Sequence, residues 1–288
     1  MSIGRIFKMC KLNHKKLITL ILLTIILISL PLSCFSIGDQ QTVSQSIVIY
    51  GDSRTDHQTH QKMVDEIIKT KPNIVFHTGD LVEDGLIPDQ WATFNEIISD
   101  LIKIADFYPA LGNHENNSPL YFANFILPNN KRWYSVEKDN LHFIVLDSNS
   151  DCSIGSEQYL WLEDDLQNIK ENIKFVIAIF HHPPFSTGHH TEDEKGLRQT
   201  IIPLFEQYGV DIVFNGHDHD YERSLYHNIY YVVTGGGGAP LYGQARKSPY
   251  SQLFIKAYHF CKLFLSNNQL IIEVYDINSN LIDRLVID

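Results

Sequence analysis

Short apolar runs in this chain repeatedly end next to side chains that can bind a metal ion. Each run has the length and composition of a buried β-strand. The runs span residues 47–50, 74–78, 107–111, 175–180 and 211–214, and they are followed by Gly51-Asp52, Gly79-Asp80, Gly112-Asn113, His181-His182 and Asn215-Gly216-His217. In open α/β sheets, ligand sites lie beyond the carboxyl ends of the strands. The recurrence therefore calls for a fold that brings several strand ends to one edge.

Segments with helical periodicity separate the first strands. Residues 57–69 carry apolar side chains at helical spacing, and a second helix begins near Pro88. Ser156 caps a third helix, while Thr191 and Glu194 have the spacing of a capping box before a fourth, which bends at Pro203. An order of strand, helix and strand favours parallel pairing with the helices outside the sheet.

The middle and C-terminal parts contain strands joined by short turns. Residues 133–136 and 141–147 are expected to pair, and further strands are expected at 229–234, 258–265, 270–275 and 281–287. Such strands need antiparallel pairing. We therefore expect a mixed α/β (α+β) fold in which two mixed β-sheets pack face to face, helices cover both outer sides, and the candidate ligands lie along one edge.

The first 36 residues have the pattern of a secretory leader. Basic residues without any acidic residue precede the apolar run 17–32, which closes at Ser33-Cys34. That run is short for a spanning helix, which needs roughly 20 residues, so export is favoured over a permanent anchor. Residues 30–34 also resemble an imperfect lipobox, in which Cys34 would carry a lipid that attaches the protein to the membrane. We expect residues 1–36 to be a signal peptide or lipoprotein leader, 37–46 a linker, and 47–288 a single secreted, periplasmic or otherwise extracytoplasmic domain.

The expected domain is strongly acidic. The leader holds 5 of the 23 Lys and Arg residues and none of the 34 Asp and Glu residues, so 18 basic side chains remain against 34 acidic ones, a formal charge of −16. Such a surface repels nucleic acids, and we expect no nucleic-acid partner. Cys152 and Cys261 are the only cysteines beyond the leader. Both a disulfide between them and two separate buried thiols are compatible with the sequence.

Together, the strand ends supply two carboxylates, one amide oxygen and three imidazoles. These are Asp52, Asp80, Asn113, His181, His217 and His219. The set can hold two metal ions if one carboxylate bridges them, and its mixture of oxygen and nitrogen suits iron, zinc or manganese rather than calcium. Two such ions retain positive charge that attracts a phosphate group, and they clamp both oxygens of an in-line displacement. The set predicts phosphoester hydrolysis by attack of a metal-bound hydroxide.

The order and the residues of these motifs resemble those of the calcineurin-like metallophosphoesterase superfamily. The motifs are GD at 51–52, GD at 79–80, GNHE at 112–115, a strand ending in His181, and GHDH at 216–219. The longer GHDHDYER and the C-terminal strands look most like the purple acid phosphatase branch, and the resemblance covers residues 47–288. It implies a four-layer αββα sandwich.

The resemblance also implies a role for each candidate residue. One metal would be held by Asp52, Asp80 and His219, and the other by Asp80, Asn113, His181 and His217, with Asp80 as the bridge. His114 would orient the phosphate or help the leaving oxygen to depart. His189 or His190, in the loop after His181, would act as an outer-sphere histidine.

Two positions depart from the family pattern. Arg54 stands where much of the superfamily has a histidine, and Glu83 stands where the purple branch has the tyrosine that gives its colour. The first metal thus lacks its usual fourth protein ligand, for which water, Glu83, Asp56 or His57 could substitute, and no purple colour is expected. Arg54 could bind phosphate oxygens through its planar fork, or it could pair with Asp56 or Glu83.

We therefore expect an exported, metal-dependent phosphoesterase that acts on a small phosphorylated substrate, with monoesters preferred on the basis of the resemblance. A phosphodiesterase using the same site and a catalytically silent metal-binding or structural homologue are the alternatives; the incomplete first metal site favours the silent homologue. A zinc β-lactamase-like hydrolase also uses a His-x-His pair. Its next aspartate–histidine pair does not follow here, because Tyr221 comes directly after Asp220.

Overall fold

The computed structural model describes residues 46–288. The expected leader, with Cys34, and residues 37–45 of the expected linker lie outside the described residues. Within residues 46–288, no helix combines the length and the apolar character needed to cross a membrane.

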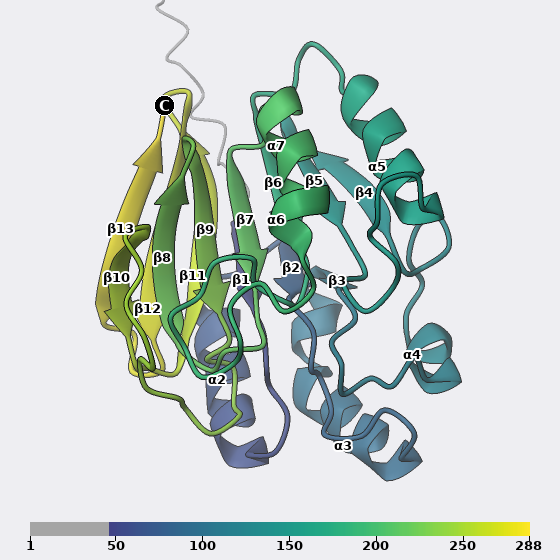
Figure 1. Cartoon of the computed structure of the whole chain (residues 1–288). Helices are drawn as coiled ribbons and strands as arrows, with labels where there is room; N and C mark the ends of the chain where they lie inside the picture. Colours follow the sequence, from purple (N-terminus) through teal and green to yellow (C-terminus); the bar gives the residue numbers. More distant parts are fainter. Residues whose placement is uncertain (1–45) are drawn as a thin grey trace, which may run out of the picture. The chain divides into compact units, whose positions relative to one another are not determined.

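Two β-sheets form the centre of the fold (Figure 1). The first has the strand order β13 (Leu281–Ile287), β12 (Gln269–Asp276), β11 (His259–Ser266), β1 (Ile47–Tyr50), β2 (Ile74–His77) and β3 (Asp106–Pro109). The second has the order β10 (Ser251–Ile255), β8 (Tyr221–Tyr226), β9 (Ile229–Thr234), β7 (Ile212–Asn215), β6 (Phe175–Ile179), β5 (Leu141–Val145) and β4 (Tyr134–Lys138). In each sheet, parallel strands lie next to antiparallel ones. The sequence-based expectation of two mixed sheets is confirmed.

Helices cover the outer faces of both sheets. α2 (His57–Lys69), α3 (Pro88–Ile98), the short 3-10 helix η1 (Leu101–Lys103) and α4 (Pro119–Asn124) belong to the side of the first sheet, and α5 (Glu157–Gln167), α6 (Leu197–Thr200) and α7 (Ile202–Tyr208) to the side of the second (Figure 1). The layers are therefore helix, sheet, sheet and helix, as expected.

Strand β6 shows how the sequence specifies these layers. Its residues Phe175, Ile177 and Ile179 face the core between the two sheets, whereas Val176 and Ala178 face the core beneath the helices. Side chains alternate along a strand, so a strand that is apolar at every position is buried on both faces. This explains why the runs that begin the βα units are continuously hydrophobic.

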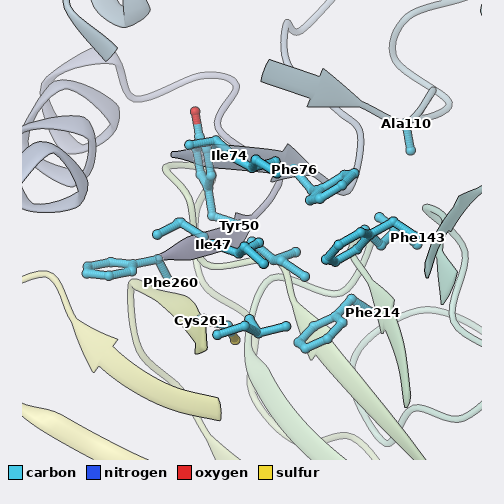
Figure 2. Close-up of a cluster of buried hydrophobic side chains, with 14 of the residues drawn as sticks. Ile47, Tyr50, Ile74, Phe76, Ala110, Phe143, Phe214, Phe260 and Cys261 are labelled. Atoms are coloured by element: carbon cyan, nitrogen blue, oxygen red, sulfur yellow. The ribbon is translucent and has the colours of Figure 1, made fainter. Parts of the chain in front are cut away.

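The core between the sheets is closed by aromatic contacts. Figure 2 shows Phe76, from the first sheet, next to Phe143, from the second. The Phe76 and Phe143 rings stack with their centroids 4.6 Å apart. These contacts fix the two sheets against each other.

Two of the predicted helix starts are confirmed, and the capping box is wrong. Ser156 caps α5 by accepting from the Tyr159 N–H, and Pro88 lies in the first turn of α3. No capping box forms at Thr191 and Glu194: α6 begins later, at Leu197, whose N–H donates to Asp193 Oδ1 at 2.7 Å.

The predicted bend at Pro203 is a break between two helices, α6 and α7. Proline has no N–H to donate, and its ring meets the carbonyl of the preceding turn. The chain therefore ends one helix and starts another at Ile201. Gly209 then ends α7 in the left-handed conformation, as expected.

Two strands, β8 and β10, were not predicted. They pair with each other, and β8 also pairs with β9. The Tyr221 hydroxyl donates to Asp283 Oδ2 at 2.6 Å, and Arg223 Nε donates to the same oxygen at 2.8 Å. β8 therefore links the second sheet to β13 of the first. The polar composition of YERSLY concealed the strand, because its polar side chains have partners rather than solvent.

Cys152 and Cys261 are separate, buried thiols. Of the two alternatives left open by the sequence, the structure therefore contains the unpaired one.

We expect replacement of Phe143 by alanine to lower the free energy of unfolding by about 3–5 kcal/mol. The side chain is fully buried between the sheets, and its removal leaves a cavity that the facing Phe76 cannot fill. Urea denaturation measures the loss. The control is Ile126→Ala, which truncates a side chain that is 97% exposed and should change stability by no more than about 0.5 kcal/mol. Equal effects of the two substitutions would contradict the described core.

Candidate metal centre

The six candidate ligands converge at one rim of the sandwich. Asp52, Asp80 and Asn113 follow β1, β2 and β3 of the first sheet, and His181, His217 and His219 follow β6 and β7 of the second. Both sheets direct these strands so that their carboxyl ends reach the same rim. Asp52 and His217, which are 165 positions apart in sequence, are therefore in contact here.

Short distances join the ligand atoms. His181 Nε2 lies 3.0 Å from Asn113 Oδ1, 3.2 Å from His217 Nδ1 and 3.4 Å from Asp80 Oδ1. His219 Nε2 lies 3.5 Å from Asp52 Oδ1. Two overlapping groups of potential ligands, Asp52-Asp80-His181 and His181-His182-His217, satisfy the spacing that a metal ion needs. Buried aspartate and histidine clusters of this kind are consistent with a site for two metal ions.

The glycines of the ligand motifs are required by close packing. A Cβ on Gly112 would lie 2.1 Å from Asp80 Oδ1, and one on Gly51 would lie 1.8 Å from Thr78 Oγ1. Asp52 and Asp80 themselves have φ values of 56° and 57°, in the left-handed region that aspartate tolerates better than most residues. The Gly-Asp pairs therefore turn the chain sharply and direct both carboxylates into the rim.

Two of the imidazole rings are oriented by hydrogen bonds on their far sides. Nδ1 of His181 lies 3.0 Å from the Thr78 carbonyl oxygen, and Nδ1 of His219 lies 2.8 Å from the Pro240 carbonyl oxygen. A carbonyl oxygen only accepts, so each Nδ1 carries the hydrogen and each Nε2 faces the centre. Such outer hydrogen bonds are typical of metal-binding histidines. His217 is reversed: its Nδ1 faces His181, and its buried Nε2, 3.5 Å from Glu194 Oε1, makes no hydrogen bond.

The buried charges draw a cation into the centre. Burial and the charge of Asp80 raise the pKa of Asp52 well above its usual range. Burial opposes ionisation of Asp80 as well, but the charge and hydrogen bond of His181 hold the pKa of Asp80 below its usual range. Burial by itself would lower the pKa of His181, yet the charges of Asp80 and Asp52 raise it to about 9. A metal ion binding here would displace the proton that these aspartates attract to His181.

The other two histidines are neutral, as metal ligands must be. Burial and the charge of His181 lower the pKa of His217 to about 2, and burial lowers the pKa of His219 to about 4. The atoms that face one another are therefore mostly lone-pair donors: imidazole nitrogens, an amide oxygen and carboxylate oxygens. This donor set suits transition metals such as zinc, iron or manganese.

The guanidinium of Arg54 lies among the ligands of the first position. Its Nη1 donates to Glu83 Oε2 at 2.6 Å, its Nε lies 3.4 Å from Asp80 Oδ2, and its Nη2 lies 3.4 Å from His219 Nε2. Of the two alternatives that the sequence left open, pairing with Glu83 is therefore present.

The three histidines expected to assist catalysis occupy different places. His114 lies at the mouth of the centre: Nδ1 is 2.6 Å from the Glu83 carbonyl oxygen and Nε2 is 3.8 Å from Asp80 Oδ2. The His190 ring stacks on His217 with centroids 3.8 Å apart, and its Nδ1 lies 3.0 Å from Asp218 Oδ1. His189 is exposed and lies beside the Tyr242 ring, at 4.9 Å between centroids.

His182 is also near the centre, in a group with His181 and His217. Its Nδ1 bonds with the Ser148 hydroxyl at 2.8 Å, and its Nε2 lies 3.3 Å from Glu194 Oε1. It therefore shares Glu194 with His217.

Glu115, for which no role was expected, connects two of the ligand loops. Its buried carboxylate accepts from the backbone N–H groups of Gly112 at 2.6 Å, Leu81 at 2.8 Å and Asp80 at 2.9 Å. The carboxylate therefore joins the loop that carries Asp80 to the loop that carries Asn113. Its place in the GNHE motif was a usable signal.

Asp218 and Tyr242 are two further residues that support the ligands. Asp218 Oδ1 accepts from the N–H groups of His189 and His190 at 2.8 and 2.9 Å, and its place within GHDH was again a signal. The Tyr242 ring stacks on His219 at 4.1 Å and 14°. Tyr242 lies in an irregular stretch without a motif, and nothing in the sequence pointed to it.

Comparisons with known proteins agree with this architecture. The sequence model of the family described as calcineurin-like phosphoesterase matches residues 46–221. Purple acid phosphatase 18 of Arabidopsis thaliana is 30% identical over 177 residues, which make up 56% of this chain and 40% of that protein. The plant protein named "Probable inactive purple acid phosphatase 24", also from Arabidopsis thaliana, is 26% identical over 277 residues, covering 75% of this chain and 44% of that protein.

A solved structure has the same fold. The purple acid phosphatase PPD1 from yellow lupin matches with a TM-score of 0.77 at 23% identity, over 86% of this chain and 54% of that chain. The likeness shows the αββα sandwich. The chain spans about half the length of the curated relatives, between 40% and 51% for the first ones.

We expect Glu115→Gln to weaken metal binding by about 10–100-fold, as is typical for residues that orient ligands from outside. The amide NH₂ cannot accept the backbone N–H groups that one carboxylate oxygen now accepts, so the loops of Asp80 and Asn113 lose their connection. Competition with a chelating dye for Mn²⁺ or Zn²⁺ measures the affinity. Glu96→Gln, on the exposed face of α3, is the matched control. Unchanged affinity in a folded Glu115→Gln protein would show that Glu115 does not position the ligands.

Proposed function

The chain belongs to the calcineurin-like phosphoesterase family, and on that premise we propose that it hydrolyses phosphate monoesters at the metal centre. One observation carries the proposal: two carboxylates, an amide oxygen and three imidazole nitrogens converge at one rim, and hydrogen bonds on their far sides hold His181 and His219 in place. The similarity to purple acid phosphatases supports monoesters as the substrate class.

The six ligands define two positions that share Asp80. Asp52, Asp80 and His219 surround the first position, and Asp80, Asn113, His181 and His217 surround the second. Iron, zinc and manganese are the candidates for this mixed donor set. When bound, metal ions at such a centre supply an acidified water molecule as the nucleophile and neutralise the charge on the phosphate oxygens.

His114 is placed to serve the leaving oxygen. Because Nδ1 faces a carbonyl oxygen, it carries a hydrogen and fixes the plane of the ring. Nε2 then points toward the centre, where in the protonated ring it can donate to a phosphate oxygen or to the departing ester oxygen. His190, held by Asp218 against His217, is the second candidate for this task.

We further propose that the protein acts outside the cytoplasm on small phosphorylated molecules rather than on nucleic acids. The basic and apolar pattern of residues 1–36 and the formal charge of −16 beyond them support this proposal. Mass spectrometry of the mature N-terminus tests it: a leader removed before or at Cys34 is expected, with a lipid on Cys34 if the protein is anchored. A retained, unmodified leader would contradict export.

Phosphatase assays test the proposed reaction directly. The metal-loaded protein should hydrolyse p-nitrophenyl phosphate faster than bis-p-nitrophenyl phosphate, and Asp80→Asn should abolish turnover because both metal positions lose a shared ligand. His114→Gln should lower kcat by about 10²–10⁴-fold, the usual contribution of a general acid or base. His227→Gln, at an exposed histidine in the turn between β8 and β9 whose partner is Glu206, is the control and should keep the wild-type rate.

Three outcomes would contradict the proposal. A diester rate equal to the monoester rate would indicate a phosphodiesterase. A metal-loaded but inert wild-type protein would indicate a silent homologue, as the names of some relatives suggest for those proteins. Full activity of Asp80→Asn would place the reaction elsewhere.

A further inference from the structure

The side chain of Arg54 occupies the space in which the first metal ion would bind. Asp52, Asp80 and His219 are the protein ligands of that position. Arg54 Nε lies 3.4 Å from Asp80 Oδ2, and Nη2 lies 3.4 Å from His219 Nε2, while His219 Nε2 is itself 3.5 Å from Asp52 Oδ1. The guanidinium therefore points at the ligand atoms that would otherwise face a metal ion.

We propose that the Arg54 guanidinium is the resident cation of the first position, so that this centre holds one metal ion, at the second position, instead of two. The inference rests on the proposed function, because it concerns the same site and specifies its cation content. It follows from the packing around Arg54, the supply of ligands and the charge balance.

Arg54 is held in this place from its outer side. Nη1 donates to Glu83 Oε2 at 2.6 Å, and the Thr55 hydroxyl donates to the same oxygen at 2.6 Å, which fixes the carboxylate. The Tyr242 side chain, stacked on His219, also hydrogen-bonds with Arg54. The Arg54 side chain is only 12% exposed. For a metal ion to enter, the guanidinium would have to leave a site in which each of its three nitrogens has an acceptor or a ring nitrogen beside it.

Asp56, Glu83 and His57, the residues that could substitute as a fourth ligand of the first metal, have other partners or lie elsewhere. Asp56 accepts from the N–H groups of Gln58 and Thr59 and from the Thr59 hydroxyl, and thereby caps α2. Glu83 is bound to Arg54 and Thr55. His57 lies on a surface hollow with Gln58, Gln61 and Asp65. None of these residues supplies a fourth ligand to the first position, whereas the second position adds Asn113, His181 and His217 to Asp80.

The charge balance also favours one metal ion. The Asp52 and Asp80 carboxylates are buried and close enough for their charges to repel. A guanidinium at the first position and a divalent ion at the second neutralise both carboxylates and leave net positive charge for a phosphate. A second divalent ion would lie beside the guanidinium and be repelled by it in a site with little water to screen the charges.

Metal counting tests this inference without any measurement of activity. The wild-type protein is saturated with Mn²⁺, freed of excess metal by gel filtration and measured by elemental analysis, and it should contain about one ion per chain. Arg54→His should contain about two, because the substitution removes the cation and adds a ligand. Electron paramagnetic resonance should report an isolated ion in the wild type and a magnetically coupled pair in Arg54→His. Arg284→His, at an arginine on β13 whose partner is Glu273, is the matched control and should keep about one ion.

A second variant guards against misfolding. Arg54→Met keeps a long unbranched side chain but removes the guanidinium with its charge and hydrogen bonds, so it should bind more than one ion at high metal concentration while its circular dichroism stays that of the wild type. Two tightly bound ions in the wild type would overturn the inference and leave the proposed phosphatase function intact. No bound metal in the wild type, together with no phosphatase activity, would instead overturn the proposed function and the inference with it.

Discussion

Two neighbouring buried aspartates, Asp52 and Asp80, set the main electrostatic constraint on this structure. Each follows a parallel strand of the first sheet, and neither residue is more than 1% exposed. Like charges in such surroundings are unstable unless cations or hydrogen bonds compensate them. The chain answers with the His217 N–H on Asp52, the His181 ring beside Asp80, and the guanidinium of Arg54. Together with the neighbouring imidazoles, the two carboxylates form a buried cluster that is consistent with a metal site.

The geometry of the centre depends on how the two sheets are held together, because each sheet supplies half of the ligands. Several contacts keep them in place. The Phe76 and Phe143 rings stack in the middle of the core, and Tyr221 and Arg223 of β8 both bond to Asp283 of β13. The His217 N–H donates to Asp52 across the rim itself. A shift of one sheet against the other would therefore separate the aspartate and asparagine ligands of the first sheet from the histidine ligands of the second.

Much of this architecture was readable from the sequence. The continuous apolar runs indicated strands buried on both faces, and glycine followed by aspartate, asparagine or histidine indicated where those strands end. The likeness to a known family then assigned the six ligands to two positions. Polar strands were missed: in β8, Glu222 is buried because it accepts from the Thr187 N–H and hydroxyl, a long-range pairing that no local pattern encodes. Likewise, that Arg54 points inward while Glu83 holds it could not be chosen from the sequence, because both orientations of an arginine satisfy local rules.

The stretch between β9 and β10 belongs to neither sheet, yet it touches the centre directly. It begins with the glycines of 235–238, presents the Pro240 carbonyl to His219, and lays the Tyr242 ring against that histidine. Backbone N–H groups of Gly237, Ala239 and Tyr242 donate to the carbonyl oxygens of Gly51, Asp52 and His219, respectively. An insertion between residues 237 and 242 would therefore displace Asp52 or His219, so the length of this stretch is inherited together with the ligands that it holds.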